Sequence, residues 1–259
     1  MAGDAKERLT AEERRAQILR CATAVFARSN YRVAGMAEIA KEAGISEPTV
    51  YKHFDSKKHL FLTILDKAGA STLRHWEDLS ERSPDTLSLL RQIGLSHYDV
   101  VQAHPDSLKV QFQALSETED EEIRETLKRN FASYADFIAR VLHEGKERAQ
   151  IHARVDVRAA AWQLISIGFT LNLTSLLGFN SEMSRETLEV MGDSLLMTFG
   201  ADAPTLEAPS RKSGNPIAPA AVAPGSEAGL KQRLVRDAAI AKGREAGLKQ
   251  PPVRKDLDQ

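Results

Sequence analysis

The sequence predicts an all-α fold from about residue 11 to residue 200, followed by a tail of different composition. Apolar residues recur at intervals of three and four along this stretch, which is the period of a helix. No segment shows the regular alternation of apolar and polar residues that marks a half-buried strand. Capping residues and Gly or Pro breaks divide the stretch into about nine helical segments.

The first predicted helix is longer than the second, and a loop separates them. The helical period predicts one helix over about residues 12–28 and a second over 36–43. Asn30, in the loop, tolerates left-handed backbone. Gly35 can cap the second helix, only a few tenths of a kcal/mol less well than Ser or Thr. Gly44 ends that helix, since glycine readily takes the positive φ that follows a helix C-terminus.

A third short helix and a long fourth helix follow the glycine turn. Ser46 is a natural N-cap, and Pro48 stands in the first turn, where its missing N–H costs little. The Asp-Ser pair at 55–56 then caps a long helix that reaches about residue 79. Two short helices joined by a glycine turn predict a helix-turn-helix over about residues 34–53.

Five further helices are predicted after the long one. Asp85 is the candidate N-cap of the first, and Pro105 lies in the break before the second. The fourth begins at Asp156. The predicted ranges are 86–103, 107–115, 118–148, 156–178 and 184–199.

Both ends of the chain are predicted to be disordered. Residues 201–259 hold seven of the ten prolines and no aromatic residue, so they cannot bury enough apolar surface to offset the entropy of ordering. The motif EAGLKQxxVR occurs twice in this tail, at 227–236 and at 245–254. A partner-binding or DNA-binding element is the alternative interpretation of this repeat. Residues 1–10 are polar and predict a disordered arm.

Charge is distributed unevenly along a chain whose net charge is −1. Residues 1–60 hold eleven Lys or Arg against eight Asp or Glu, the tail holds ten against seven, and the middle is therefore acidic. A mildly basic N-terminal segment attached to an acidic body suits a module that contacts nucleic acid.

Cysteine content and hydropathy predict a soluble, cytoplasmic protein that does not enter the membrane. Cys21 is the only cysteine, so no intramolecular disulfide can form, which fits a reducing compartment. We interpret it as a small buried side chain, with a redox sensor as the alternative. The N-terminus lacks the apolar core of a signal peptide, and polar residues interrupt the most apolar run, 159–177.

The helix-turn-helix carries a specific motif. Residues 39–60 read I-A-x-x-A-G-I-S-x-P-T-V-Y-x-H-F-x-S-K-x-x-L, and the first helix reads A-x-x-V-F-A-R-x-x-Y. This pattern closely resembles the DNA-binding signature of TetR-family transcriptional regulators over about residues 11–65. Ala34 and Gly35 stand where the family often has two threonines, so one hydroxyl contact to phosphate is lost. The resemblance implies a three-helix DNA-binding domain at 11–71 and a helical ligand-binding and dimerisation domain at 72–200.

The candidate DNA-binding residues lie in and around the third helix. The hydroxyls of Thr49 and Tyr51 can donate to phosphate oxygens, and Lys57 can pair with a phosphate at the start of the next helix. By resemblance, these three and His53 match family positions that fix the third helix on the DNA backbone. The positions left for reading base edges are Ser46, Glu47, Pro48 and Lys52. Gly35 completes the predicted set, and the implied partner is double-stranded DNA with a near-palindromic operator.

The body is predicted to hold a ligand site. In the family, the region between 86–115 and 119–148 encloses an inducer, whereas the residues alone fit a plain core equally well. The candidate ligand-binding residues are His97, Tyr98, Phe112, Phe131 and Tyr134. Their aromatic character implies a small hydrophobic or aromatic ligand.

The body is also predicted to form a homodimer. The helix at 156–178 is apolar on more than one side, which predicts burial against its own subunit and against a second one. The candidate interface residues are Leu164, Gly168, Leu171, Leu188 and Leu195.

No catalytic set, metal site or cofactor motif is visible, so the chain is not predicted to be an enzyme. His97 and His104 could share a helix face, but they lack a third ligand. The predicted function is therefore a dimeric, sequence-specific repressor released by a small hydrophobic ligand. The alternatives are a non-inducible architectural DNA binder and a helical-bundle ligand-binding protein.

Overall fold

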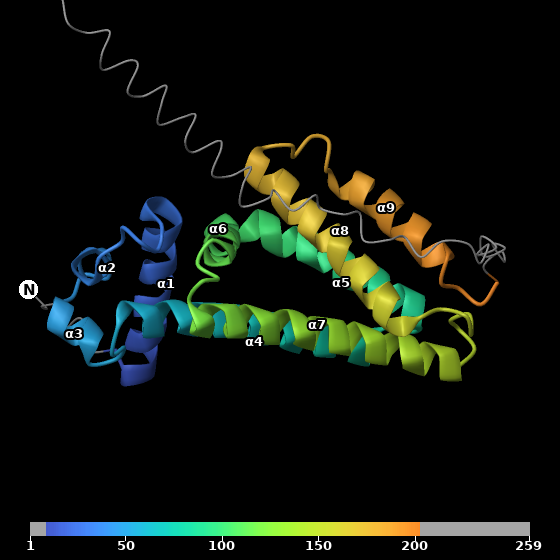
Figure 1. Cartoon of the computed structure of the whole chain (residues 1–259), viewed down its shortest axis with the longest axis horizontal. Coiled ribbons are helices and arrows are strands. Elements are labelled where there is room, and N and C mark those ends of the chain that lie inside the picture. Colours follow the sequence, from blue (N-terminus) through green and yellow to red (C-terminus); the bar gives the residue numbers. More distant parts are fainter. Residues whose placement is uncertain (1–8, 203–259) are drawn as a thin grey trace, which may run out of the picture. The chain divides into compact units, whose positions relative to one another are not determined.

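The computed structural model describes residues 9–202, and every regular element in this range is a helix (Figure 1). Within the same range, the only β contact is an isolated antiparallel bridge between Ile151 and Gly200. The all-α prediction is therefore confirmed. The predicted arm before residue 9 and most of the predicted tail, including its repeat, lie outside the described residues.

The first four helices follow the predicted order. They are α1 (Ala11–Ser29), α2 (Met36–Glu42), α3 (Glu47–Tyr51) and α4 (Lys57–Arg82). We call α1, α2, α3 and the first part of α4, to residue 65, the head, and the rest of the described chain the body.

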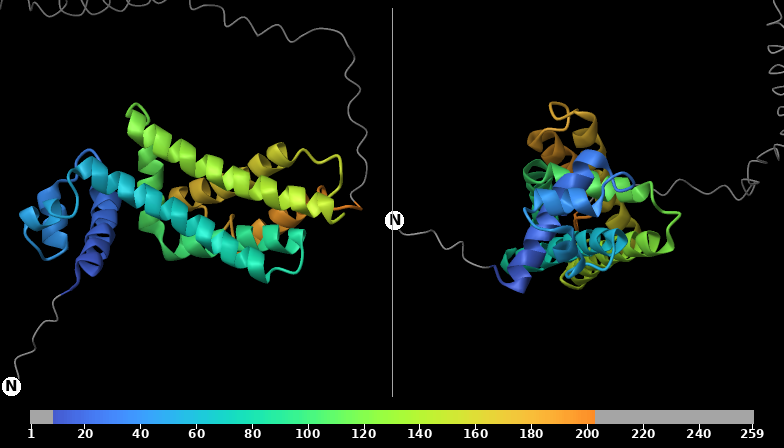
Figure 2. Two further views of the ribbon diagram at one scale, coloured as in Figure 1. Left: turned by 90° about the horizontal axis from the view of Figure 1, so that it is seen from below. Right: turned by 90° about the vertical axis from the view of Figure 1, so that its left-hand side faces the viewer.

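The body contains the remaining helices of the described range. They are α5 (Thr86–Ala103), α6 (Pro105–Leu115), α7 (Glu121–Glu147), α8 (Val157–Leu177) and α9 (Arg185–Met197). In both Figures 1 and 2, α4 and α7 run side by side, and α5, α8 and α9 pack together beside them.

Local capping explains most of these boundaries. Asp85 and Asp156 accept hydrogen bonds from the first-turn amides of α5 and α8, as predicted. Gly178 ends α8 with φ 83°. Two starts differ from prediction. Pro105 is the first residue of α6, since a proline fits that position. α7 begins after Asp120, whose carboxylate accepts from two first-turn amides.

The core of the head includes residues from the body. Its centre is formed by fully buried side chains from α1 to α4, among them Phe26, Val50 and Phe61. Helices α6 and α7 close this core from the other side. They contribute Val110, Ala114, Ile123 and Leu127.

Helices α4 and α7 come close together at Gly69. A Cβ atom at this position would lie 2.6 Å from Cγ of Asn130. The Asn130 amide donates to the Leu65 carbonyl at 3.1 Å, and Arg129 pairs with Asp66 at 2.6 Å. On α4, this contact therefore lies between the head core and the body core. The body core is a second apolar cluster, to which α4 contributes the buried Trp76.

Candidate nucleic-acid interface and ligand pocket

The helix-turn-helix has the predicted backbone geometry. Gly35 is the N-cap of α2 in extended conformation, and Gly44 takes φ 64° in the turn that follows. The amide of Ile45 donates to the Ala40 carbonyl at 3.0 Å and closes this turn. Ile39 of α2 is fully buried. The turn thus holds α3 on a rigid apolar base.

The side chains of α3 divide into a buried and an outward face. Val50 and Phe54 are fully buried. The predicted DNA-binding residues that lie exposed are Gly35, Ser46, Pro48, Tyr51 and Lys52, while Glu47, Thr49, His53 and Lys57 are half-buried. Of this exposed set, Ser46, Tyr51 and Lys52 carry polar groups on or directly beside α3.

Ser46 caps α3 differently from the prediction. It holds the N-cap position, but its side chain makes no hydrogen bond to the first-turn amides. Its hydroxyl instead lies 2.8 Å from the Thr49 hydroxyl. The two predicted DNA-contacting hydroxyls are therefore partners of each other in this structure.

Lys57 does not point freely outward. Its ammonium donates to the carbonyls of Arg32 and Ala34 at 3.1 and 3.0 Å, and it lies 5.0 Å from the centre of the Tyr31 ring. The prediction assigned this charge to a phosphate. In the structure it holds the loop between α1 and α2, because two carbonyls of that loop face it.

Arg15 of α1 supports α3 and was missed in the sequence. Its guanidinium donates to the His53 carbonyl at 2.7 Å and lies 4.2 Å from the centre of the Phe54 ring. It therefore brings a positive charge to the C-terminal end of α3. The sequence offers only a basic residue on the polar side of the first helix, and its partners lie far along the chain.

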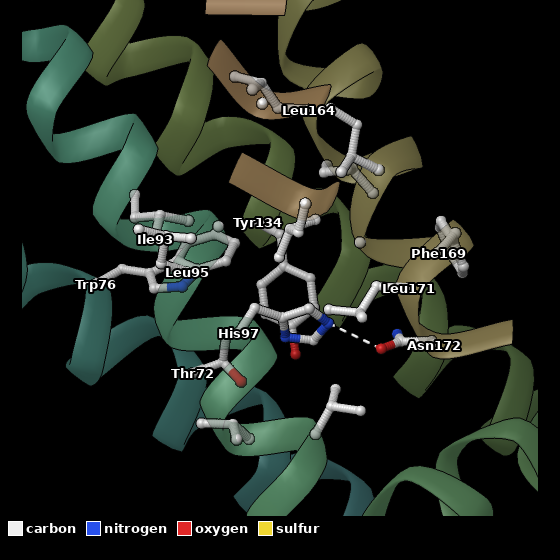
Figure 3. A pocket seen from close by; sticks show the side chains of 18 of the residues that line it. Thr72, Trp76, Ile93, Leu95, His97, Tyr134, Leu164, Phe169, Leu171 and Asn172 are labelled. Carbon is white, nitrogen blue, oxygen red and sulfur yellow. Dashed lines mark hydrogen bonds between the residues drawn. The ribbon is translucent and has the colours of Figure 1, made fainter. Parts of the chain in front are cut away.

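The body encloses a cavity of about 170 Å³ between α4, α5, α7, α8 and α9, with α6 at its edge. Its walls are mostly apolar, as Figure 3 shows for Trp76, Leu95, Leu164 and Phe169. Three of the predicted ligand residues, His97, Phe131 and Tyr134, line this cavity. A mostly apolar cavity with few polar groups is typical of a site for a small hydrophobic molecule.

The other two predicted ligand residues do not line the cavity. Tyr98 and Phe112 pack against an apolar cluster that contains Val101, Leu108 and Met183, of which Val101 and Leu108 line the cavity. The helical period identified helices that do line the cavity. It did not separate His97 from Tyr98, because adjacent residues of a helix point in different directions. Asn172 of α8, which does line the cavity, carried no signal in the sequence.

Two titratable side chains in the cavity are shifted by burial. Burial lowers the pKa of His97, against the opposing effect of its hydrogen bond to Asn172. Burial also raises the pKa of Tyr134, against a hydrogen bond with Thr72. Both side chains are therefore uncharged at neutral pH, and the cavity presents hydrogen-bonding groups without charge.

A network of ion pairs lies at the edge of the cavity. Nε of Arg91 lies 2.8 Å from Oδ1 of Asp193, and its Nη2 lies 3.3 Å from Oε2 of Glu189. The hydrogen bond to Asp193 is the largest cause of the raised pKa of Arg91. All three residues line the cavity.

The predicted dimer-interface residues contact other parts of their own subunit, and their role in a dimer stays a prediction. Leu164, Gly168, Leu171 and Leu188 line the cavity, and Leu195 packs against the body core. A Cβ at Gly168 would lie 3.6 Å from Cδ2 of His97. The close approach predicted at this glycine thus occurs within the subunit, because this face of α8 packs on α5.

A different face of α8 and α9 is apolar and exposed. Trp162, Leu173 and Leu177 on α8 are 44%, 49% and 63% exposed, and Val190 and Met197 on α9 are 62% and 71% exposed. The spacing of the α8 residues places them on one side of the helix. These five residues are called the outer stripe.

α8 also qualifies by length and composition as a membrane-spanning helix, and it is the only helix in the described part of the chain that does. The polar interruptions noted in the sequence do not bring its hydropathy below that of a spanning segment. Core helices of water-soluble proteins can meet the same criterion. Ala160, Ala161 and Leu171 of α8 are buried within the subunit.

Among residues 9–202, no three His, Cys, Asp or Glu side chains lie together as a metal site would require. Cys21 is half-buried, and burial raises the pKa of its thiol.

The arrangement in the head matches a known family. The family model for bacterial regulatory proteins of the tetR family matches residues 18–64, from the middle of α1 into α4. This match identifies residues 18–64 as a domain of that family. The all-helical architecture of the described chain also agrees with solved structures. Over 71% of this chain and 96% of the other, it superposes with a TM-score of 0.61 and 19% identity on the regulator FadR from Bacillus subtilis, crystallised in complex with stearoyl-CoA.

Two curated proteins are similar in sequence to part of this chain. It is 32% identical over 106 residues to the HTH-type transcriptional activator FasR of Mycolicibacterium smegmatis, which covers 41% of this chain and 48% of FasR. It is 26% identical over 145 residues to the fatty acid metabolism regulator protein of Bacillus subtilis, which covers 56% and 74%. The chain thus spans about half the length of FasR.

Proposed function

We propose that this TetR-family protein is a dimeric, sequence-specific DNA-binding repressor that leaves its operator when a small hydrophobic ligand enters the cavity of the body. The carrying observation is the set of exposed polar side chains on and beside α3, on a head whose core is completed by α6 and α7, two helices that also line the cavity. Tyr51 and Lys52 are exposed on α3. An aromatic hydroxyl and an ammonium group suit contacts with phosphates and base edges.

Helix α6 links the cavity to the head. Ser107, Leu108 and Gln111 line the cavity, whereas Val110 lies in the head core. The Gln113 amide donates to the Phe26 carbonyl near the end of α1, at 2.9 Å. A ligand that displaces α6 must therefore also displace contacts of α1.

Helix α4 provides a second connection. Thr72 and Trp76 of this helix line the cavity, whereas Leu60 and Phe61 of the same helix lie in the head core. Ligand pockets commonly measure about 300–1,000 Å³, more than the cavity has here. A ligand of that size has to move the walls, so it favours a different placement of the heads.

The coupling required is modest. A ligand shifts the equilibrium only by its preference for one conformation over the other. A 10- to 100-fold loss of operator affinity corresponds to about 1.4–2.7 kcal/mol of coupling. An acyl chain is a suitable ligand class for an apolar cavity, and the stearoyl-CoA complex of the Bacillus subtilis FadR structure supports this choice.

Dimerisation would occur through the outer stripe. Large apolar side chains gathered on one exposed surface commonly mark a protein–protein interface. A two-fold dimer would place two α3 helices about one DNA turn, roughly 34 Å, apart. Such a dimer would bind a near-palindromic operator.

The test is selection of genomic fragments with the purified full chain, compared with the variants Tyr51→Ala and Lys52→Ala. The matched control is Lys128→Ala, which removes an exposed lysine of α7 paired only with Glu125. We expect recovery of a near-palindromic site with the wild-type chain and the control, and its loss with Tyr51→Ala.

Other outcomes of the selection separate the alternatives. Equal recovery of all fragments would support an architectural DNA binder, which also predicts a steep dependence of affinity on salt. Recovery of no fragment would contradict DNA binding and favour a ligand-binding protein. Release by ligand is then tested by adding stearoyl-CoA to the operator complex. Unchanged operator affinity with stearoyl-CoA and with shorter acyl-CoA molecules would contradict an acyl inducer.

A further inference from the structure

One pair of polar side chains faces into the cavity from opposite helices. Nε2 of His97 on α5 lies 2.9 Å from Oδ1 of Asn172 on α8, and both side chains line the cavity (Figure 3). Gly168 lies one turn before Asn172 and leaves room for the imidazole ring, since a Cβ there would only just touch it. The geometry therefore presents His97 and Asn172 together to any molecule in the cavity.

The contact between them fixes which atoms remain available. An amide oxygen can only accept, so Nε2 of His97 is the donor and carries the proton. A neutral imidazole then has an unprotonated Nδ1, which can accept one hydrogen bond. The Asn172 amide nitrogen keeps its two hydrogens for donation. The pair thus offers a donor and an acceptor, and neither carries a charge.

The cavity offers little to a charged ligand. Arg91 is the one Lys or Arg among the residues that line it, all of which belong to the described chain. Its guanidinium is already paired with Asp193 and Glu189. Those two carboxylates also line the cavity and are already paired, Asp193 with Arg91 and Glu189 with both Arg91 and Arg185. A carboxylate in the cavity would find no free cation, and an ammonium ion would find no free carboxylate.

We propose that the His97–Asn172 pair determines the ligand class by selecting apolar molecules that carry an uncharged hydrogen-bonding group, such as a thioester, ester or amide, over free carboxylates and alkylammonium ions. This inference rests on the proposed ligand cavity and specifies its ligand. The Asn172 amide donates to the carbonyl oxygen of the ligand, and Nδ1 of His97 accepts from an N–H or O–H where the ligand has one. The apolar walls hold the rest of the molecule.

The selection follows from the cost of burial. An ionised group loses its hydration in an apolar cavity, and without a partner of opposite charge this loss is not recovered. A neutral carbonyl loses much less and recovers it through one hydrogen bond. The same alkyl chain should therefore bind best when its polar end is uncharged.

The first experiment compares three probes of equal chain length with the full wild-type protein. Methyl octanoate, octanoate and octylamine are titrated calorimetrically at neutral pH, where the acid and the amine are both ionised. We expect methyl octanoate to bind at least about tenfold more tightly than either charged probe, a difference of about 1.4 kcal/mol. Equal or tighter binding of octanoate would overturn the proposal, as would tighter binding of octylamine.

Variants of the pair test its role directly. Asn172→Leu retains the approximate volume but removes the donor, and we expect about a tenfold loss of methyl octanoate affinity. His97→Gln retains a side-chain N–H that can reach Asn172 and should stay within about threefold of the wild-type affinity. The matched control is Tyr98→Phe, because Tyr98 is adjacent to His97 but is not among the residues that line the cavity. An unchanged ligand ranking in Asn172→Leu would overturn the assignment.

Operator binding is measured in parallel and separates this inference from the proposed function. The ranking of probes in the wild-type chain needs no variant, so a variant that fails to fold leaves the test intact. Intact operator binding with a preference for charged probes, or with no binding of methyl octanoate, would refute the ligand class alone. Absence of operator binding by the wild-type chain would refute the proposed function instead.

Discussion

Arg15 shows how a single side chain on α1 can control the position of α3. Its guanidinium donates a hydrogen bond to the carbonyl of His53, just after the end of α3, and lies over the Phe54 ring. Because α3 is one of the shortest helices in the described chain, its own hydrogen bonds are few, and contacts from outside contribute much of its order. The same charge lies close to the surface that would meet DNA.

We predict that Arg15→Ala lowers the free energy of unfolding by about 1–2 kcal/mol, since it removes a charged hydrogen bond and a cation–π contact. Operator affinity should fall as well, by more than this destabilisation explains. The matched control is Arg14→Ala, whose side chain bonds only to Gln17 on the same helix. Urea denaturation and operator titration measure the two effects. Equal results for both variants would contradict a special role of Arg15.

Residue roles could be predicted from the sequence where they depend on near neighbours. Gly35 and Gly44 were identified because capping and turn conformations involve only a few consecutive residues. Lys57 was assigned to phosphate because its carbonyl partners come from another loop. Asn172 gave no signal at all, since its meaning comes from His97 on a different helix.

At the scale of elements, the contact of α4 with α7 at Gly69 leaves no free space beside the glycine. Gly69 allows Asn130 to reach the Leu65 carbonyl of α4. This crossing lies between the head core and the cavity, so it determines how a movement of α4 at Trp76 is transmitted to the head.

We predict that Gly69→Ala destabilises the fold by about 1–2 kcal/mol, because the new methyl group collides with Asn130 and outweighs the better helix propensity of alanine. In an Asn130→Ala background the same change should become stabilising. The matched control is Gly94→Ala on α5, where a Cβ meets no atom within 4 Å and a gain of up to about 1 kcal/mol is expected. Urea denaturation of the wild-type chain, of Gly69→Ala and Asn130→Ala, of their double variant and of the Gly94→Ala control provides the measurement. A destabilising Gly69→Ala in both backgrounds would rule out this explanation.

Helix boundaries were predictable to within a few residues because caps and breaks are local. The range 86–103 agrees with α5, and Asp156 and Gly178 delimit α8 as expected. The start of α7 was placed three residues early, at Thr118, because several polar residues there can each begin a helix. Only the direction of the Asp120 carboxylate toward the first-turn amides decides between them.

At the scale of the whole molecule, the orientation of α8 about its own axis decides which of its residues line the cavity and which are exposed on the surface of the subunit. This helix is apolar around its circumference, so the helical period gives no preferred face. The sequence could predict two buried faces but not which residues belonged to each. Packing against α5 and α7 assigns Leu164 and Gly168 inward and leaves Leu173 outward.

We predict that Leu173→Glu and Val190→Glu convert the dimer into a monomer, because each introduces a charge into the outer stripe. Sedimentation velocity at micromolar concentration should show at least a tenfold weaker dimer. The matched control is Val33→Glu, which introduces the same charge at a 74% exposed valine in the loop after α1. A wild-type monomer, or a dimer that survives both outer-stripe variants, would show that the interface lies elsewhere.

Because α6 and α7 contribute residues to the head core, a head cannot be exchanged between related proteins without a mismatch at this core. A chimera joined at residue 71 would remove Val110, Ala114, Ile123 and Leu127 from beneath the transplanted head. Both pieces would then carry mismatched apolar surfaces. A recombination event that brings a new operator preference must therefore bring compatible α6 and α7 surfaces with it. DNA choice and ligand response are inherited together in such a molecule, as one block rather than as separable modules.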